Sequence, residues 1–129
     1  MDIYRGVIIE ESLENLSVFD GLRIVMTKIE RVSECTKTPW LKVWTLHTVE
    51  IDAAIAEDVA QKISDSIDRK HAHAWYADFR NDRTHYIIFR GKIFVINIHD
   101  QSQYYGAKRY GLNLAIPVSQ MPFVASPSS

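Results

Sequence analysis

Residues 73–98 constrain the fold of this chain more than any other stretch. They contain three short apolar segments separated by two tight turn signals. The first signal is Asn81 with Asp82, which tolerate positive φ, and the second is Arg90 with Gly91. Strands joined by such short turns pair with their neighbours in antiparallel fashion. The stretch therefore predicts a three-stranded antiparallel meander.

Both faces of this meander are apolar. One face is predicted to carry Tyr76, Ile87, Phe89, Phe94 and Ile96, and the other Trp75, Phe79, Tyr86, Ile88, Ile93 and Val95. An antiparallel sheet with one solvated face instead alternates apolar and polar residues. Another layer of the chain or a partner subunit must therefore cover the second face, and we expect a homodimer.

Three earlier segments, at residues 4–10, 22–32 and 40–51, are rich in β-branched and alternating apolar residues. This pattern is typical of strands. The second and third segments are predicted to pair as a long antiparallel hairpin.

The hydrophobic period changes after Asp52. Ile55, Val59 and Ile63 recur every four residues, which predicts a helix over residues 53–69 with these three side chains buried. Asp52 is a favourable N-cap because its carboxylate can accept hydrogen bonds from amides of the first turn.

A second helix is predicted to begin near Asp100 and to end at Gly111. The resulting order is β-β-β-α-β-β-β-α, which indicates the α+β class. We expect an antiparallel sheet of about six strands with both helices packed on one face. Residues 1–129 are expected to form a single domain, with a tail that frays from about residue 124.

Composition and charge exclude several classes of protein. Hydrophobic residues make up 47% of the chain and charged residues 24%, which is too apolar for intrinsic disorder. The formal net charge is −1, so no whole-chain field attracts nucleic acid or an anionic membrane. No apolar run reaches the length of a membrane-spanning helix, and we expect a cytoplasmic protein. Cys35 is the single cysteine and cannot form an internal disulfide.

The chain resembles a family of small uncharacterised prokaryotic proteins in three segments, YRGVIIEESL, TPWLKVWTLHTVEI and WYADFRNDRTHYIIFRGKIF. The resemblance covers most of the chain. It implies a compact cytosolic α+β domain of unknown function, and it supplies no catalytic or binding residue.

Asp78 and His85 are the candidate catalytic residues. A two-residue turn at Asn81 and Asp82 would place Asp78 directly opposite His85, where the carboxylate can fix the tautomer of the imidazole and stabilise its protonated form. This pair lacks a nucleophile, since Thr84 is predicted to point to the other face. The alternative interpretation is a structural ion pair at the end of a hairpin.

The candidate ligand-binding residues are His47, Trp75, Tyr76 and Tyr86. Histidines including His47, His71 and His73 suggest a metal site, but their pattern is weak and we expect neither a metal nor a cofactor. Aromatic residues interleaved with arginines also resemble sheets that bind nucleic acid, although aromatics on strands are more often core. The favoured hypothesis is a binding or interaction domain that acts through residues 73–98, by self-association or with a small ligand. The alternative is an enzyme that uses Asp78 and His85 in acid–base chemistry.

Overall fold

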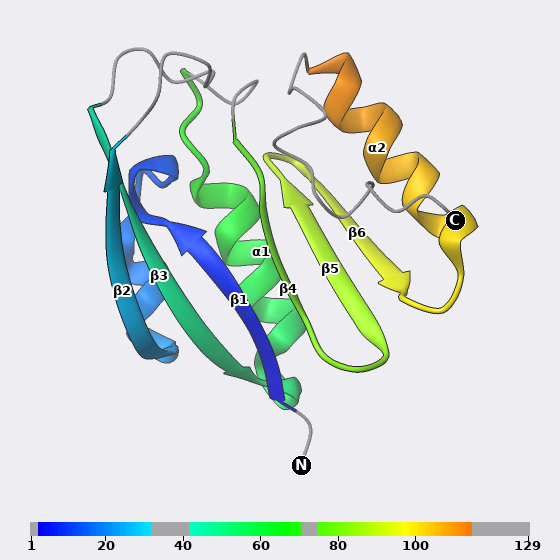
Figure 1. Cartoon of the computed structure of the whole chain (residues 1–129), viewed down its shortest axis with the longest axis horizontal. Helices are drawn as coiled ribbons and strands as arrows, with labels where there is room; N and C mark the ends of the chain where they lie inside the picture. The colour runs from blue at the N-terminus through cyan, green and yellow to red at the C-terminus, as the bar shows by residue number, and fades with distance from the viewer. Residues whose placement is uncertain (1–2, 32–41, 71–74, 115–129) are drawn as a thin grey trace.

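The computed structural model describes residues 3–31, 42–70 and 75–114. Six strands form one sheet in the order β2-β3-β1-β4-β5-β6, and every neighbouring pair is antiparallel (Figure 1). The strands are β1 (Ile3–Ile9), β2 (Arg23–Arg31), β3 (Val43–Asp52), β4 (Ala77–Arg80), β5 (Thr84–Phe89) and β6 (Lys92–Asn97). The predicted α+β class and six-stranded antiparallel sheet are confirmed. The described residues do not include the tail from about residue 124, nor Cys35, His71 and His73.

Two α-helices and four 3-10 turns complete the described chain. They are η1 (Glu10–Ser12), η2 (Leu16–Gly21), η3 (Ala53–Ile55), α1 (Ala56–Ser66), η5 (Gln101–Gln103) and α2 (Tyr104–Asn113). The Asp52 side chain accepts a hydrogen bond of 2.9 Å from the Ala54 amide, as the sequence predicted. Gly111 lies inside α2 instead of ending it.

The predicted helix over residues 53–69 is shorter at both ends. Its first turn is the 3-10 turn η3, which places Ile55 out of phase with the helix, so Ile55 is exposed and its predicted burial is wrong. Val59 and Ile63 are buried as predicted. The helix stops at Ser66 because Ile67 is extended and pairs with Leu13 in an isolated bridge, where its side chain joins the core. A tertiary contact therefore overrides the helical pattern of the sequence.

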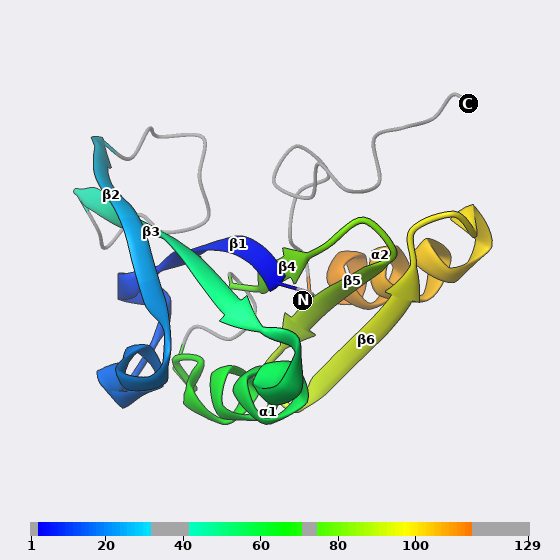
Figure 2. The same ribbon diagram turned by 90° about the horizontal axis from the view of Figure 1, so that it is seen from below.

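The two helices pack on opposite faces of the sheet, so their predicted placement on one face is wrong. Residues of α1 share a core cluster with Ile88, whereas Tyr104 and Ala107 of α2 share a separate cluster with Ile87. Consecutive residues of a strand point to opposite faces. Figure 2 shows α1 and α2 on the two sides of β5 and β6.

The two helices explain why both faces of the meander are apolar. Trp75 and Ile88 are buried on the side of α1, and Ile87 and Phe89 are buried on the side of α2. Another layer of the same chain covers each face. The apolar faces of the meander thus supply no reason of their own for a second subunit.

Gly6 lets the two halves of the sheet meet. It lies opposite Phe79 where β1 pairs with β4. A Cβ atom at this position would overlap the carbonyl oxygen of Asp78 and lie 2.7 Å from the Cα atom of Phe79. Only glycine fits this approach without moving a strand.

Among the described residues, β2 and β6 are the edge strands of the sheet. Along β2, the exposed apolar side chains include Ile24, Val25, Met26 and Ile29. Within the described ranges, no helix combines the length and the apolar character needed to cross a membrane.

Candidate functional site

The first hairpin of the meander has a different register from the predicted one. Arg80 lies opposite His85 and Asp78 lies opposite Ile87, so the predicted direct pairing of Asp78 with His85 is wrong. The register is shifted by two residues. Because side chains alternate with a period of two, such a shift keeps each side chain on its original face. Asp78 and His85 therefore still share a face, as diagonal neighbours.

Asn81 explains the shift. Its backbone N–H donates a 3.0 Å hydrogen bond to the Thr84 carbonyl, so Asp82 and Arg83 become the central residues of the turn. The Asn81 side-chain oxygen accepts hydrogen bonds of 2.8 Å from the amides of Arg83 and Thr84. Asparagine thus closes the turn from its first position, an Asx-type role that differs from the predicted central one.

His85 forms the centre of a hydrogen-bonded chain of three side chains. Its Nε2 atom lies 2.6 Å from Oδ2 of Asp78, and its Nδ1 atom lies 3.0 Å from the Tyr104 hydroxyl. An ionised carboxylate only accepts hydrogen bonds, so Nε2 carries a proton. In the neutral imidazole, Nδ1 then accepts the proton of the Tyr104 hydroxyl. Burial raises the pKa of Tyr104, which keeps this phenol protonated at neutral pH.

The chain is largely closed to solvent. His85 is 3% exposed and Tyr104 is also buried, whereas the Asp78 side chain is 37% exposed. Tyr76 lies on the same face. Burial is the larger cause that raises the pKa of Tyr76, and the negative charge of Asp78 is the smaller one. Asp78 and Tyr104 occupy both nitrogens of the His85 ring, so the arrangement connects α2 to β4 and β5. Sequence reasoning missed Tyr104, because only the packing of α2 on the sheet brings it to His85.

The other predicted ligand-binding residues do not converge. Trp75 is buried on the face of α1, where Tyr86 stacks on Phe79 at 4.8 Å between ring centroids. Tyr76 lies on the opposite face, near Phe89 of the α2 cluster. His47 lies on β3, two strands away from β4 in the sheet. Over residues 3–31, 42–70 and 75–114, no group of three or more metal-ligating side chains could hold an ion.

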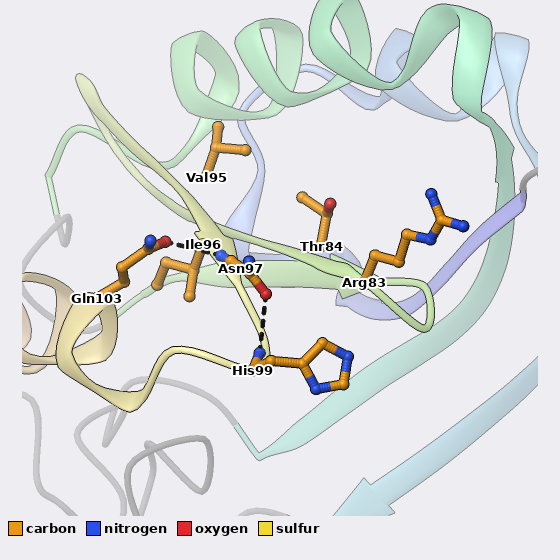
Figure 3. Close-up of a pocket in the computed structure, with 7 residues that line it drawn as sticks. All are labelled: Arg83, Thr84, Val95, Ile96, Asn97, His99 and Gln103. Carbon is orange, nitrogen blue, oxygen red and sulfur yellow. Dashed lines mark hydrogen bonds between the residues drawn. The ribbon is translucent and has the colours of Figure 1, made fainter.

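A shallow depression of about 550 Å³ lies at one end of the meander. Its lining comprises Arg83, Thr84, Val95, Ile96, Asn97, His99 and Gln103 (Figure 3). Thr84 and Val95 point toward the side of the sheet that carries α1, while Gln103 approaches from the opposite side of β6. The depression thus lies where the Asp82–Arg83 turn and the segment that leads into α2 flank the end of β6. None of its polar residues was among the predicted catalytic or ligand-binding residues.

Short hydrogen bonds fix the polar lining. The Asn97 amide donates to Oε1 of Gln103 at 2.7 Å, and the His99 amide donates to Oδ1 of Asn97 at 2.9 Å (Figure 3). The described residues of the lining include Arg83 and His99 but no carboxylate. Among the described residues, the Arg83 guanidinium forms no ion pair.

Comparisons of the chain with protein-family models, with curated proteins and with solved structures found no match.

Proposed function

We propose that this chain is a small binding domain that takes a small anionic ligand in the depression at the end of the meander. The observation that carries the proposal is the composition of the lining, whose described residues supply a guanidinium and an imidazole but no carboxylate. Anions are recognised by such donors, and guanidinium binds carboxylate and phosphate groups in a bidentate manner.

The hydrogen-bond donors of the lining support this choice. Asn97 uses its side-chain oxygen to accept the His99 amide, which leaves its NH₂ group to donate. The nearby carboxylate of Asp100 accepts hydrogen bonds from the amide and hydroxyl of Ser102, and these bonds lower its pKa. The negative charge of Asp100 is thus hydrogen-bonded to the first residues of η5.

The floor of the depression supplies apolar contact. Val95 is 57% exposed, and the neighbouring Ile96 is buried opposite His85 in the β5–β6 pair. The hydrogen bonds of His85 to Asp78 and Tyr104 hold this part of the sheet in place. A ligand with a short apolar body and one anionic group matches a lining of this kind.

The test is a titration of the purified chain, labelled with ¹⁵N, with inorganic phosphate and with small mono- and dicarboxylates. Amide signals of Arg83, Asn97 and His99 should shift together, in proportion to occupancy. At a ligand concentration of roughly 100 times Kd, the free energy of unfolding should rise by about 2.7 kcal/mol. Arg83→Gln should abolish the shifts, whereas Arg23→Gln is the matched control, because Arg23 lies on β2 at the far edge of the sheet.

Three results would contradict the proposal. The first is a panel that leaves these three amides unmoved at high ligand concentration. The second is equal binding by the wild type and Arg83→Gln, because binding would then occur elsewhere or through bulk charge. The third is an equal loss of binding in Arg83→Gln and Arg23→Gln, which would indicate non-specific screening.

Acid–base catalysis by Asp78 and His85 is the second proposal, and the 2.6 Å contact between their side chains favours it. The observation against this second proposal is that His85 is nearly closed to solvent and does not line the depression. A ligand that reached the imidazole would perturb the ring ¹⁵N signals of His85 in the same titration. Unmoved ring signals on a saturated protein would remove this proposal and leave the binding function intact.

Homodimer formation also remains a proposal, as do the cytoplasmic location and membership of the family that the sequence resembles. The exposed apolar side chains of the free edge strand β2 support self-association there, since an open edge can pair with a strand of another chain. Sedimentation at micromolar concentration checks it. Ile29→Lys should then shift the protein to monomer, and a wild type that is monomeric throughout would contradict it.

A further inference from the structure

A second carboxylate–imidazole–hydroxyl chain lies on the other half of the sheet, away from the meander. His47 of β3 is directly opposite Thr27 of β2, and directly opposed residues point to the same face. The His47 Nδ1 atom lies 2.9 Å from the Thr27 hydroxyl, and its Nε2 atom lies 2.8 Å from Oε1 of Glu10. Glu10 begins the 3-10 turn that follows β1.

The chemistry of the three groups fixes the protons in this chain. The Glu10 carboxylate only accepts hydrogen bonds, so the Nε2 atom of His47 carries the proton between them. In the neutral imidazole, the lone pair of Nδ1 then faces the Thr27 hydroxyl, which donates to it. This is the arrangement in which an imidazole can remove a hydroxyl proton while a carboxylate holds the ring in the required tautomer.

Exposure distinguishes the hydroxyl from its base. Thr27 is exposed on the edge strand β2, whereas the His47 side chain is only 12% exposed. The Phe19 ring covers the imidazole in an edge-to-face contact, with 4.9 Å between ring centroids. The nucleophilic atom can therefore meet a substrate from solvent, while the base behind it is shielded.

A neighbouring threonine gives a contrast. The Thr45 hydroxyl donates directly to the Glu11 carboxylate at 2.8 Å, with no imidazole between them. The same carboxylate also accepts the Thr45 amide at 2.6 Å. That pair ties η1 to β3. Thr27 differs because its hydroxyl meets an imidazole nitrogen.

We propose that Thr27 is a nucleophile for acyl transfer from small activated esters, with His47 as its general base and Glu10 as the residue that positions the imidazole. The Thr27 oxygen attacks the ester carbonyl carbon as its proton passes to Nδ1 of His47. That proton then passes to the leaving alcohol or phenol oxygen as the ester bond breaks, which leaves an acyl ester on Thr27. Water then attacks the carbonyl carbon of this ester as its proton passes to the same nitrogen. The bond from the acyl carbon to the Thr27 oxygen breaks as that proton returns to Thr27, which releases the carboxylic acid and restores the hydroxyl.

The experiment uses the full chain and p-nitrophenyl acetate as the probe. Release of p-nitrophenolate is followed by absorbance, and the acetylated residue is located by peptide mass spectrometry after a rapid quench. The wild type should show acetyl on Thr27. Thr27→Val, which is nearly isosteric, and His47→Gln should each lower the rate of release roughly 10²-fold, at the lower end of what general-base catalysis contributes.

Two further variants separate chemistry from folding. Thr27→Ser should retain acetylation, because serine keeps the hydroxyl. Thr48→Val is the matched control, since Thr48 follows His47 on β3 and points to the opposite face. It should release p-nitrophenolate at the rate of the wild type. Circular dichroism checks that each variant is folded.

The proposal is overturned if the wild type carries acetyl only on lysines, or if folded Thr27→Val matches the wild type. It is also overturned if Thr27→Ser loses the adduct while folded. These outcomes are independent of the anion titration at Arg83, because the two sites use different strands and no common residue.

Discussion

Replacing Tyr104 with phenylalanine tests the role of the buried chain at His85. The substitution removes one oxygen atom and keeps the ring, which packs edge-on against the imidazole with 5.7 Å between centroids. Nδ1 of His85 then loses its 3.0 Å partner in a place where the residue is only 3% exposed. Leaving a buried acceptor without this hydrogen bond should cost about 1–3 kcal/mol of unfolding free energy.

Chemical denaturation and thermal unfolding measure this cost. For a domain of this size, we expect Tm to fall by roughly 4 °C per kcal/mol, so the loss should be roughly 4–12 °C. Tyr105→Phe is the matched control because Tyr105 lies next in the same helix and is 65% exposed. Its change in unfolding free energy should stay within about 0.5 kcal/mol.

The ring ¹⁵N chemical shifts of His85 provide a second readout. In the wild type they should report the tautomer protonated at Nε2, which donates to Asp78. If Tyr104→Phe proved as harmless as Tyr105→Phe, with the tautomer unchanged, the hydrogen bond would not connect α2 to the sheet. A structural role for the chain would then be refuted.

Three further outcomes follow from other contacts. Gly6→Ala should cost roughly 3 kcal/mol in denaturant unfolding, at the upper end for overpacking, because its Cβ would meet backbone atoms of β4; an alanine variant as stable as the wild type would contradict the close approach. Ser64→Ala should cost about 1–3 kcal/mol, since the buried hydroxyl donates to the Phe89 carbonyl at 2.7 Å and accepts from the Gly91 amide at 2.8 Å. Burial raises the pKa of Tyr76, so its contribution to stability is complete below about pH 10, where unfolded tyrosines begin to ionise, and is lost at higher pH. Denaturant midpoints should therefore fall above that pH, and Tyr76→Phe should reduce the fall.

The fold was predictable wherever a short-range pattern carries it. The second turn of the meander pairs Ile88 with Ile93 and Ile87 with Phe94, as predicted, because Gly91 supplies a positive φ in the turn. At the first turn, Asn81 and Asp82 could occupy two positions with similar chemistry. The side chain of Asn81 decides between them by capping the turn, and that choice is invisible in the sequence.

The shared face of Asp78 and His85 survived this error because the register moved by an even number of residues. A shift of one residue would have separated the two side chains. Tyr104 could not be predicted in the same way, since its contact with His85 depends on which face α2 covers. The sequence did indicate that both faces of the sheet are covered, because the consecutive residues Ile87 and Ile88 are both apolar and point to opposite faces. Two apolar faces in one sheet are covered here by one helix each.

The two hydrogen-bonded chains of side chains, centred on His85 and His47, differ more in burial than in composition. Each joins a carboxylate, an imidazole and a hydroxyl at hydrogen-bonding distances of 2.6–3.0 Å. In the chain at His85 the hydroxyl is buried, so its proton can move only within the fold, and the chain stabilises the contact of α2 with the sheet. In the chain at His47 the hydroxyl faces solvent, where a substrate can approach it. Loss of stability in Tyr104→Phe, together with loss of acetylation in a stable Thr27→Val, would assign packing to the first chain and chemistry to the second. The reverse pattern would show that exposure of the hydroxyl does not decide the role.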